Sequence, residues 1–374
     1  MIIITLLNVC HSSQSQSILI KGQMSSWFLY AQNEKNTSQI GMRYIPASSI
    51  SKPLNNSIIL DAEISINTYF SSYDFEFDKD HADHNLKPYR LWLRLSSNQF
   101  EARIGLQKIN FGSASLLRPL MWFDRIDPRD PLQLTNGVYG MMLRYYFLNN
   151  ANIWFWGLLG NDTTKGWELV PTEKNTIEYG GRLQYPLGPG EIGMSYHSRL
   201  MHQEDSRLGP FSFPAKTIPE QRFAVDGKWD LTIGLWFETV ITHHQVDPLP
   251  LNYKKMLTLG SDYTFGLGNG LHVLGEYFVF ETSEKLFNTG EQIKFSALSA
   301  RYPIGILDQI TAIYYYDWKN KQHYRFLSLQ RSYDNWSFHI ISFWNPPKNL
   351  IFQNQVESNI FVGKGLEVMI VFNH

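Results

Sequence analysis

The chain has 374 residues and a formal net charge of -1; 18% of its residues are charged and 15% are aromatic. Soluble globular domains usually carry about 25% charged residues, so this composition is poor in charge. A nucleic-acid-binding protein would show a basic excess, and a disordered chain would have few aromatic residues. Both classes are excluded. The single cysteine, Cys10, excludes a disulfide framework and a cysteine-based metal site.

The sequence also excludes a helical membrane protein. A membrane-spanning helix needs about 18 or more consecutive apolar residues. The longest internal apolar run, residues 153–159 (IWFWGLL), is much shorter. A transmembrane β-barrel reconciles an apolar composition with the lack of a helical span, because its strands alternate apolar and polar side chains.

The first residues have the pattern of a secretory signal. Residues 1–10 (MIIITLLNVC) are apolar, and residues 11–17 (HSSQSQS) are small and polar. An apolar core followed by small residues is typical of a cleaved signal. We therefore expect residues 1–17 to be a signal segment and residues 18–374 to form one barrel domain. A lipidated Cys10 and a native first strand are the alternatives.

Most of the chain after residue 20 alternates with a period of two. In residues 100–107 (FEARIGLQ), for example, apolar side chains alternate with Glu101, Arg103 and Gln107. Successive side chains of a strand point to opposite faces, so the pattern predicts an all-β protein. We expect strands at 21–32, 38–46, 57–70, 88–96, 99–107, 138–147, 151–160, 176–187, 190–201, 220–230, 232–244, 255–266, 270–282, 291–302, 307–318, 322–331, 334–344, 351–361 and 364–373.

The lengths of these segments favour a membrane barrel. Most have 9 to 13 residues, which is longer than the usual soluble strand of about 5–6 residues and close to the length that crosses a bilayer at a tilt. Short turns alternate with long connections, as they do in bacterial outer-membrane barrels. Nineteen segments conflict with the even strand number of such barrels, so we expect an up-and-down antiparallel barrel of about 16–18 strands.

One block resembles a known family. Arg103 to Gly112 (RIGLQKINFG) is followed by residues 117–119 (LRP) and 124–128 (DRIDP). This arrangement is similar to outer-membrane porin-type β-barrels of Gram-negative bacteria, especially those of the Bacteroidota. The resemblance implies a location in the bacterial outer membrane and a strand that leads into a long segment rich in aspartate and proline.

The polar faces of the strands are expected to line the lumen, the interior of the barrel. Arginines gather on the early strands and acids on the later ones, which would produce a transverse field that selects solutes. The alternative is that early acids such as Asp61, Glu63, Glu101 and Glu178 pair with the arginines. The expected lumen and selectivity residues are Arg90, Arg94, Arg103, Arg144, Arg182, Arg199, Glu238, Asp262 and Glu276.

Residues 108–136 form an unusually long connection. Its 29 residues exceed the roughly 12–15 beyond which a loop is usually functional or disordered, and it is too apolar for disorder. We expect it to fold into the lumen as a constriction or plug; the alternative is a cap over the barrel rim. Its expected constriction residues are Arg118, Asp124, Arg125, Asp127, Arg129 and Asp130, with the three arginines able to face solute.

The sequence carries no pattern of an enzyme. Ser195 and His197 lie two residues apart on one strand, which is not the geometry of a catalytic triad, and no cofactor or metal site is expected. We predict a channel for passive diffusion of small hydrophilic solutes, with the arginines favouring anions. The alternative is a non-conducting barrel that anchors partner proteins. Expected partners are the lipid bilayer, lipopolysaccharide and solutes, with a second copy of the chain or a lipoprotein as further candidates.

Overall fold

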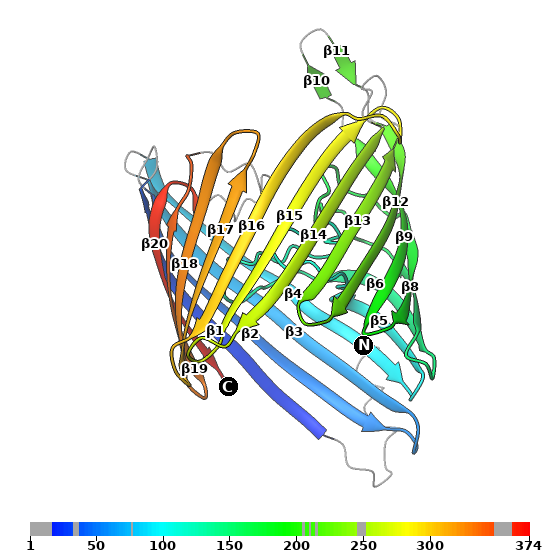
Figure 1. Ribbon diagram of the computed structural model, residues 1–374. Coiled ribbons are helices and arrows are strands. Elements are labelled where there is room, and N and C mark those ends of the chain that lie inside the picture. Colours follow the sequence, from blue (N-terminus) through cyan, green and yellow to red (C-terminus); the bar gives the residue numbers. More distant parts are fainter. Residues whose placement is uncertain are drawn as a thin grey trace.

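The computed structural model describes residues 17–32, 37–75, 78–203, 206–208, 211–213, 216–244, 252–347 and 361–374. Eighteen strands form one antiparallel sheet (Figure 1). The sheet closes because the first strand, β1, pairs with both the second strand and the last strand, β20. This confirms the all-β barrel and the upper end of the expected strand number.

The barrel strands are β1 (Ser17–Gln32), β2 (Thr37–Pro53), β3 (Ile59–Phe75), β4 (Asp78–Ser96), β5 (Phe100–Gln107), β6 (Val138–Tyr146), β7 (Asn152–Leu158), β8 (Glu178–Leu187), β9 (Gly190–Gln203), β12 (Lys216–Asp230), β13 (Gly234–His244), β14 (Tyr253–Phe265), β15 (Leu271–Ser283), β16 (Glu291–Pro303), β17 (Asp308–Asp317), β18 (Gln322–Ser332), β19 (Trp336–Trp344) and β20 (Lys364–Asn373). Two short strands, β10 (Ser206–Leu208) and β11 (Phe211–Phe213), pair only with each other and form a hairpin beyond one end of the barrel (Figure 1).

Two expectations fall on residues that the structure does not describe. The expected strand at 351–361 lies outside the described residues except for Phe361, and the other eighteen expected segments each correspond to a barrel strand. The expected signal segment, residues 1–17, also lies outside them except for Ser17, which begins β1.

The long connections lie at one end of the barrel, as expected, and that end also carries the short turn 318–321 between β17 and β18. The tight turns 97–99, 188–189 and 266–270 lie at the same end as His374, whose backbone exchanges hydrogen bonds with Gly22 near the start of β1. The long connection between β5 and β6 and the β10–β11 hairpin belong to the other end.

The outer surface of the barrel is apolar. Large side chains such as Phe155, Tyr179 and Phe223 are more than half exposed there. Trp318, directly after β17, and Trp336, the first residue of β19, are also exposed. Such rings suit the headgroup level of a bilayer. Among the described residues, no helix is long and apolar enough to cross a membrane.

The lumen contains a packed apolar core. Lumen-facing rings of the later strands, among them Phe278 and Phe343, pack in one cluster with Phe111, Trp122 and Phe123 from the long β5–β6 connection. The expectation of a polar lumen face is therefore met only in part over β13–β19, where these rings alternate with polar residues such as Glu238 and Glu276. Apolar side chains can occupy the inner face of these strands because they contact a folded segment of the chain instead of water.

Candidate functional site

The connection from residue 108 to residue 137, here called the inward segment, crosses the lumen from β5 and β6 and is fixed to β13–β15. The Glu276 carboxylate on β15 accepts backbone hydrogen bonds from Ser115 (2.7 Å), Leu116 (3.0 Å) and Leu117 (2.6 Å). Three successive N–H groups that converge on one anion form a nest. The expectation of an inward-folded segment is confirmed by these contacts.

A second carboxylate holds the same segment. Glu238 on β13 accepts hydrogen bonds from the backbone N–H groups of Ala114 (2.7 Å) and Leu120 (3.1 Å). Gly112 lies so close that a Cβ atom there would be 2.3 Å from a Glu238 carboxylate oxygen, and its φ is +99°. The glycine that ends the porin-like block is therefore required by this contact.

Several side chains that were predicted to contact solute bind other residues of the chain instead. Glu238 and Glu276 face the lumen, as expected, but their carboxylates bind the inward segment. Arg118 and Arg129 are only 7% and 5% exposed, because Arg118 pairs with Asp124 (3.3 Å) and Arg129 pairs with Asp127 (2.6 Å). The expectation that these two arginines face solute is wrong.

A second connection, residues 159–177, also enters the lumen, and we call it the second inward segment. Trp167 donates from Nε1 to the Arg118 carbonyl (2.8 Å) and stacks on Phe278 with a centroid distance of 5.5 Å. A Cβ atom at Gly166 would overlap the Met121 carbonyl oxygen. The two inward segments are therefore packed against each other.

Buried ion pairs fix the second inward segment to β9 and β12. The Glu168 carboxylate lies 2.7 Å from Arg222 and 3.3 Å from Arg199. Burial would raise the pKa of the Glu168 carboxyl, but Arg199, Lys165 and Arg222 outweigh it and hold that pKa below its usual value. The sequence reading missed Lys165, Glu168 and Arg222; the unusual length of the connection was the available signal.

Most of the arginines predicted to line the lumen on the early strands, here called the arginine wall, form ion pairs with acids. Arg94 lies 2.9 Å from Asp61 and Arg103 lies 2.9 Å from Glu101. Arg182 forms two hydrogen bonds with Asp226 (2.6 and 2.8 Å), and Arg199 forms one with Glu220 (2.6 Å). The pairing alternative therefore describes Arg94 and Arg103, whereas Arg182 and Arg199 pair with acids of β12 that it did not name.

Two other predicted arginines have different surroundings. Arg144 lies 3.8 Å above the ring centroid of Trp154, and no carboxylate of the described residues forms an ion pair with it. Arg90 donates to the Thr135 carbonyl of the inward segment (3.0 Å). A register shift in β4 opposite Ser65 and Ile66 brings both Tyr89 and Arg90 to the lumen side.

The remaining predicted residues form local contacts. Asp262 lies 3.1 Å from His272 near the turn end. Arg125 donates its backbone N–H to Thr135 Oγ1 (3.1 Å), and Asp130 accepts from the backbone N–H groups of Leu132 (2.9 Å) and Leu134 (3.3 Å). These contacts stiffen the end of the inward segment.

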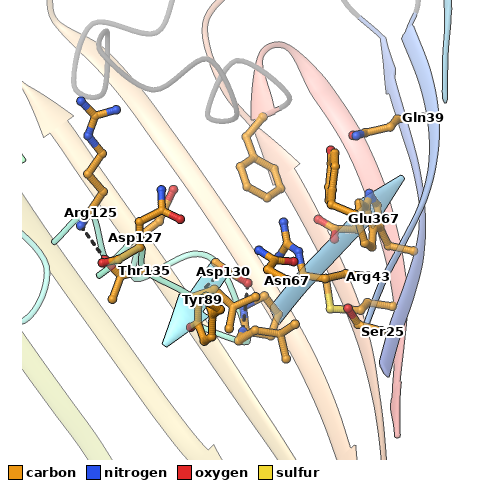
Figure 2. Close-up of a pocket in the computed structure, with 18 of the residues that line it drawn as sticks. Ser25, Gln39, Arg43, Asn67, Tyr89, Arg125, Asp127, Asp130, Thr135 and Glu367 are labelled. Atoms are coloured by element: carbon orange, nitrogen blue, oxygen red, sulfur yellow. Dashed lines mark hydrogen bonds between the residues drawn. The ribbon is translucent and has the colours of Figure 1, made fainter. Parts of the chain in front are cut away.

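A cavity of about 320 Å³ lies between the end of the inward segment and the wall formed by β1–β4 and β20 (Figure 2). Charged groups of both signs line it, including Arg43, Lys87, Arg125, Asp127, Asp130 and Glu367. Trp27, Tyr69, Tyr89 and Phe361 supply aromatic walls. Neither Glu367 nor Arg43 was singled out from the sequence.

The described residues show no catalytic or metal-binding arrangement. Ser195 accepts a hydrogen bond from Arg182 (3.0 Å), while His197 contacts Glu178 (3.1 Å) and Trp156 (3.1 Å). Ser195 and His197 are therefore bound to different partners and not to each other. In the part of the chain that the structure covers, no group of three or more metal-ligating side chains is found.

No family model matches the sequence, and a search of curated proteins finds no match. Solved structures are similar in fold. OccAB2 of Acinetobacter baumannii matches with a TM-score of 0.57 at 8% identity, over 96% of this chain and 98% of that chain. OmpF of Salmonella typhi, in complex with daunomycin, matches at 0.52 and 12%, over 96% and 97%. An anion-selective porin from Comamonas acidovorans matches at 0.50 and 11%, over 96% and 100%.

These likenesses concern the fold, and they agree with what the strands show. A closed ring of eighteen strands with an apolar outer face is a structure that crosses a membrane without a free sheet edge. The chain is a closed eighteen-stranded β-barrel with the fold of the outer-membrane porins.

Proposed function

We propose that this barrel is a non-enzymatic channel through which small hydrophilic solutes diffuse passively, along the side of the lumen bounded by β1–β4 and β20. The observation that carries the proposal is the polar cavity beside the inward segment. Across from it, the two inward segments and the apolar core occupy the lumen beside the later strands. A narrow passage lined by charges of both signs admits small polar solutes and excludes large ones.

The sequence favours anions as solutes, and the charges around the cavity moderate that expectation. Arg94, Arg103 and Arg182 each have an acidic partner, so they add little net positive potential. Arg43, Lys87 and Arg125 line the cavity together with Asp127, Asp130 and Glu367. We propose a weak anion preference that originates mainly in Arg144 and the cavity cations.

Liposome swelling tests this proposal. Proteoliposomes containing the folded barrel should swell in small neutral solutes of glycerol size and fail to swell in a trisaccharide. Equal swelling in both would contradict a narrow passage, and no swelling in either would contradict a channel.

A specific observation favours a second function. Buried aromatic rings hold the inward segment in place, and buried ion pairs hold the second inward segment. Such fixed segments suit a plugged barrel that anchors partners such as a lipoprotein. Co-purification of a stable partner, together with no swelling, would support this alternative over the channel.

A further inference from the structure

The cavity beside the inward segment contains a buried carboxyl, Glu367, and a half-buried guanidinium, Arg43, and neither forms an ion pair with the described residues. Glu367 on β20 is 3% exposed, and its Oε2 atom has no hydrogen-bond donor among the described residues. Arg43 on β2 forms no ion pair within the described ranges, and its Nε has no acceptor there. A buried charge without a partner is costly, so such groups commonly mark the site of a ligand.

Other acceptors accompany Glu367. Gln39 is 3% exposed and Asn67 is 7% exposed, and their side-chain oxygens also have no donor in the described part of the chain. Glu367 pairs with Leu29 of β1, which pairs with Gln39 of β2. Glu367 and Gln39 therefore lie in one row across β1, about 10 Å apart along the sheet. At this end the Glu367 and Gln39 oxygens lack donors among the described residues and suit a group that donates hydrogen bonds, whereas Asn67 lies near Arg43, which pairs with Tyr69 of β3.

Arg43 forms the other end of the cavity. Its guanidinium carbon lies 5.0 Å from the ring centroid of Tyr69 and 5.6 Å from that of Trp27. These rings hold the guanidinium by cation–π contacts, whereas its N–H edge is available for an acceptor. A guanidinium edge matches a carboxylate in geometry. Figure 2 shows Gln39, Arg43, Asn67 and Glu367 on the same side of the cavity.

The two other acids of the cavity already have partners. Asp127 pairs with Arg129 at 2.6 Å, and Asp130 accepts from two backbone N–H groups. Gln39 and Arg43 are four residues apart on β2, about 13 Å along the strand, and their long side chains shorten the distance that a ligand must span. A molecule with an ammonium group at one end and a carboxylate at the other, of about dipeptide length, fits this spacing.

We propose that the cavity is a binding site for small zwitterionic peptides, with the ammonium on Glu367 and Gln39 and the carboxylate on Arg43. This inference rests on the proposed function in that it names the solute class of the same passage. Binding to the site does not itself require conduction, so the two can be tested separately.

Calorimetric titration of the detergent-solubilised full barrel tests the site with three matched probes. Glycyl-L-leucine has both charges, N-acetyl-glycyl-L-leucine lacks the ammonium, and glycyl-L-leucinamide lacks the carboxylate. The zwitterion should bind at least about tenfold more tightly than either singly charged probe, which is the effect expected for loss of one charge-assisted hydrogen-bonded contact. Equal affinity of the wild-type barrel for the three probes would overturn the proposal without any variant.

Two variants assign the ends of the site. Glu367→Gln should abolish the preference for the zwitterion over the N-acetyl probe, and Arg43→Gln should abolish the preference over the amide. Asp334→Asn, in an exposed turn, changes the charge as Glu367→Gln does and should leave all three affinities unchanged. Preferences that survive in correctly folded Glu367→Gln and Arg43→Gln would overturn the assignment.

The titration and the liposome swelling assay together separate this inference from the proposed function. Conduction without selective zwitterion binding would overturn only the site. Zwitterion binding to a barrel that does not conduct would support the site and overturn only the channel.

Discussion

The Glu276 carboxylate on β15 accepts a 2.6 Å hydrogen bond from the backbone N–H of Leu117, which lies 159 residues earlier in the chain. This contact joins the far wall of the barrel to the segment that leaves β5. It shows that the inward segment is held by acids of the wall through its backbone, so the identity of many of its side chains is free to serve packing or solute contact.

Loss of this anchor should widen the passage. Glu276→Ala leaves the N–H groups of residues 115–117 without their acceptor, and each unsatisfied buried group costs about 1–3 kcal/mol. We expect larger and noisier single-channel currents than in the wild type. Glu284→Ala, an exposed loop residue, is the control. Currents identical to those of the wild type would show that the inward segment does not need the anchor.

The close contact at Gly112 predicts an asymmetric effect of two glycine substitutions. Gly112→Ala places a Cβ atom against Glu238 in a left-handed backbone conformation, and should lower the stability of the barrel by about 1–3 kcal/mol. Gly157→Ala adds a methyl group where no heavy atom lies within 4 Å and should be neutral. Unfolding in urea, followed by the mobility of unheated samples on SDS gels, measures both. Equal stability of the two variants would contradict the proposed packing.

The arginine wall should affect selectivity according to its pairing. Arg144→Gln removes a cation that has no carboxylate partner among the described residues, and should shift the reversal potential in a salt gradient toward cations. Removing Arg94 and Asp61 together deletes a charge-neutral pair and should leave the reversal potential unchanged. A larger shift for the double variant than for Arg144→Gln would reverse the assignment.

Acid should release the second inward segment. The pKa of Glu168 is lowered from 4.5 in the folded state, so its ion pairs stabilise the segment above pH 4.5 and lose this effect as the pH falls below it. Protection factors from hydrogen exchange in residues 159–177 should be high at neutral pH and should decrease at pH 3. Glu168→Gln should show low protection at both values. Protection that stays high in the variant would show that Trp167 packing suffices.

The strands could be predicted from the sequence, whereas the contents of the lumen could not. Alternation such as that of residues 100–107 indicates a strand with one apolar and one polar face. This pattern predicts both the barrel class and nearly every strand. It does not report whether an inward-facing ring such as Phe278 meets water or a folded segment. The partner of Glu276 is set by a contact between residues far apart in the chain, which no local pattern encodes.

The candidate site was likewise predictable only in part. Arg103 and Glu101 are correctly placed on the lumen face, but their pairing depends on side-chain reach. Glu367 has the same sequence signal as other polar lumen residues, and only its burial beside Arg43 in the cavity distinguishes it. The resemblance to barrels of the Bacteroidota stays a prediction.

Single-channel recording of the wild-type barrel in a planar bilayer tests the central claim most directly, since the claim is that a water-filled passage remains beside the inward segment. The structure predicts discrete current steps of small amplitude, which increase when Glu276 is replaced by alanine. A folded, inserted barrel that gives no steps in either form would contradict it.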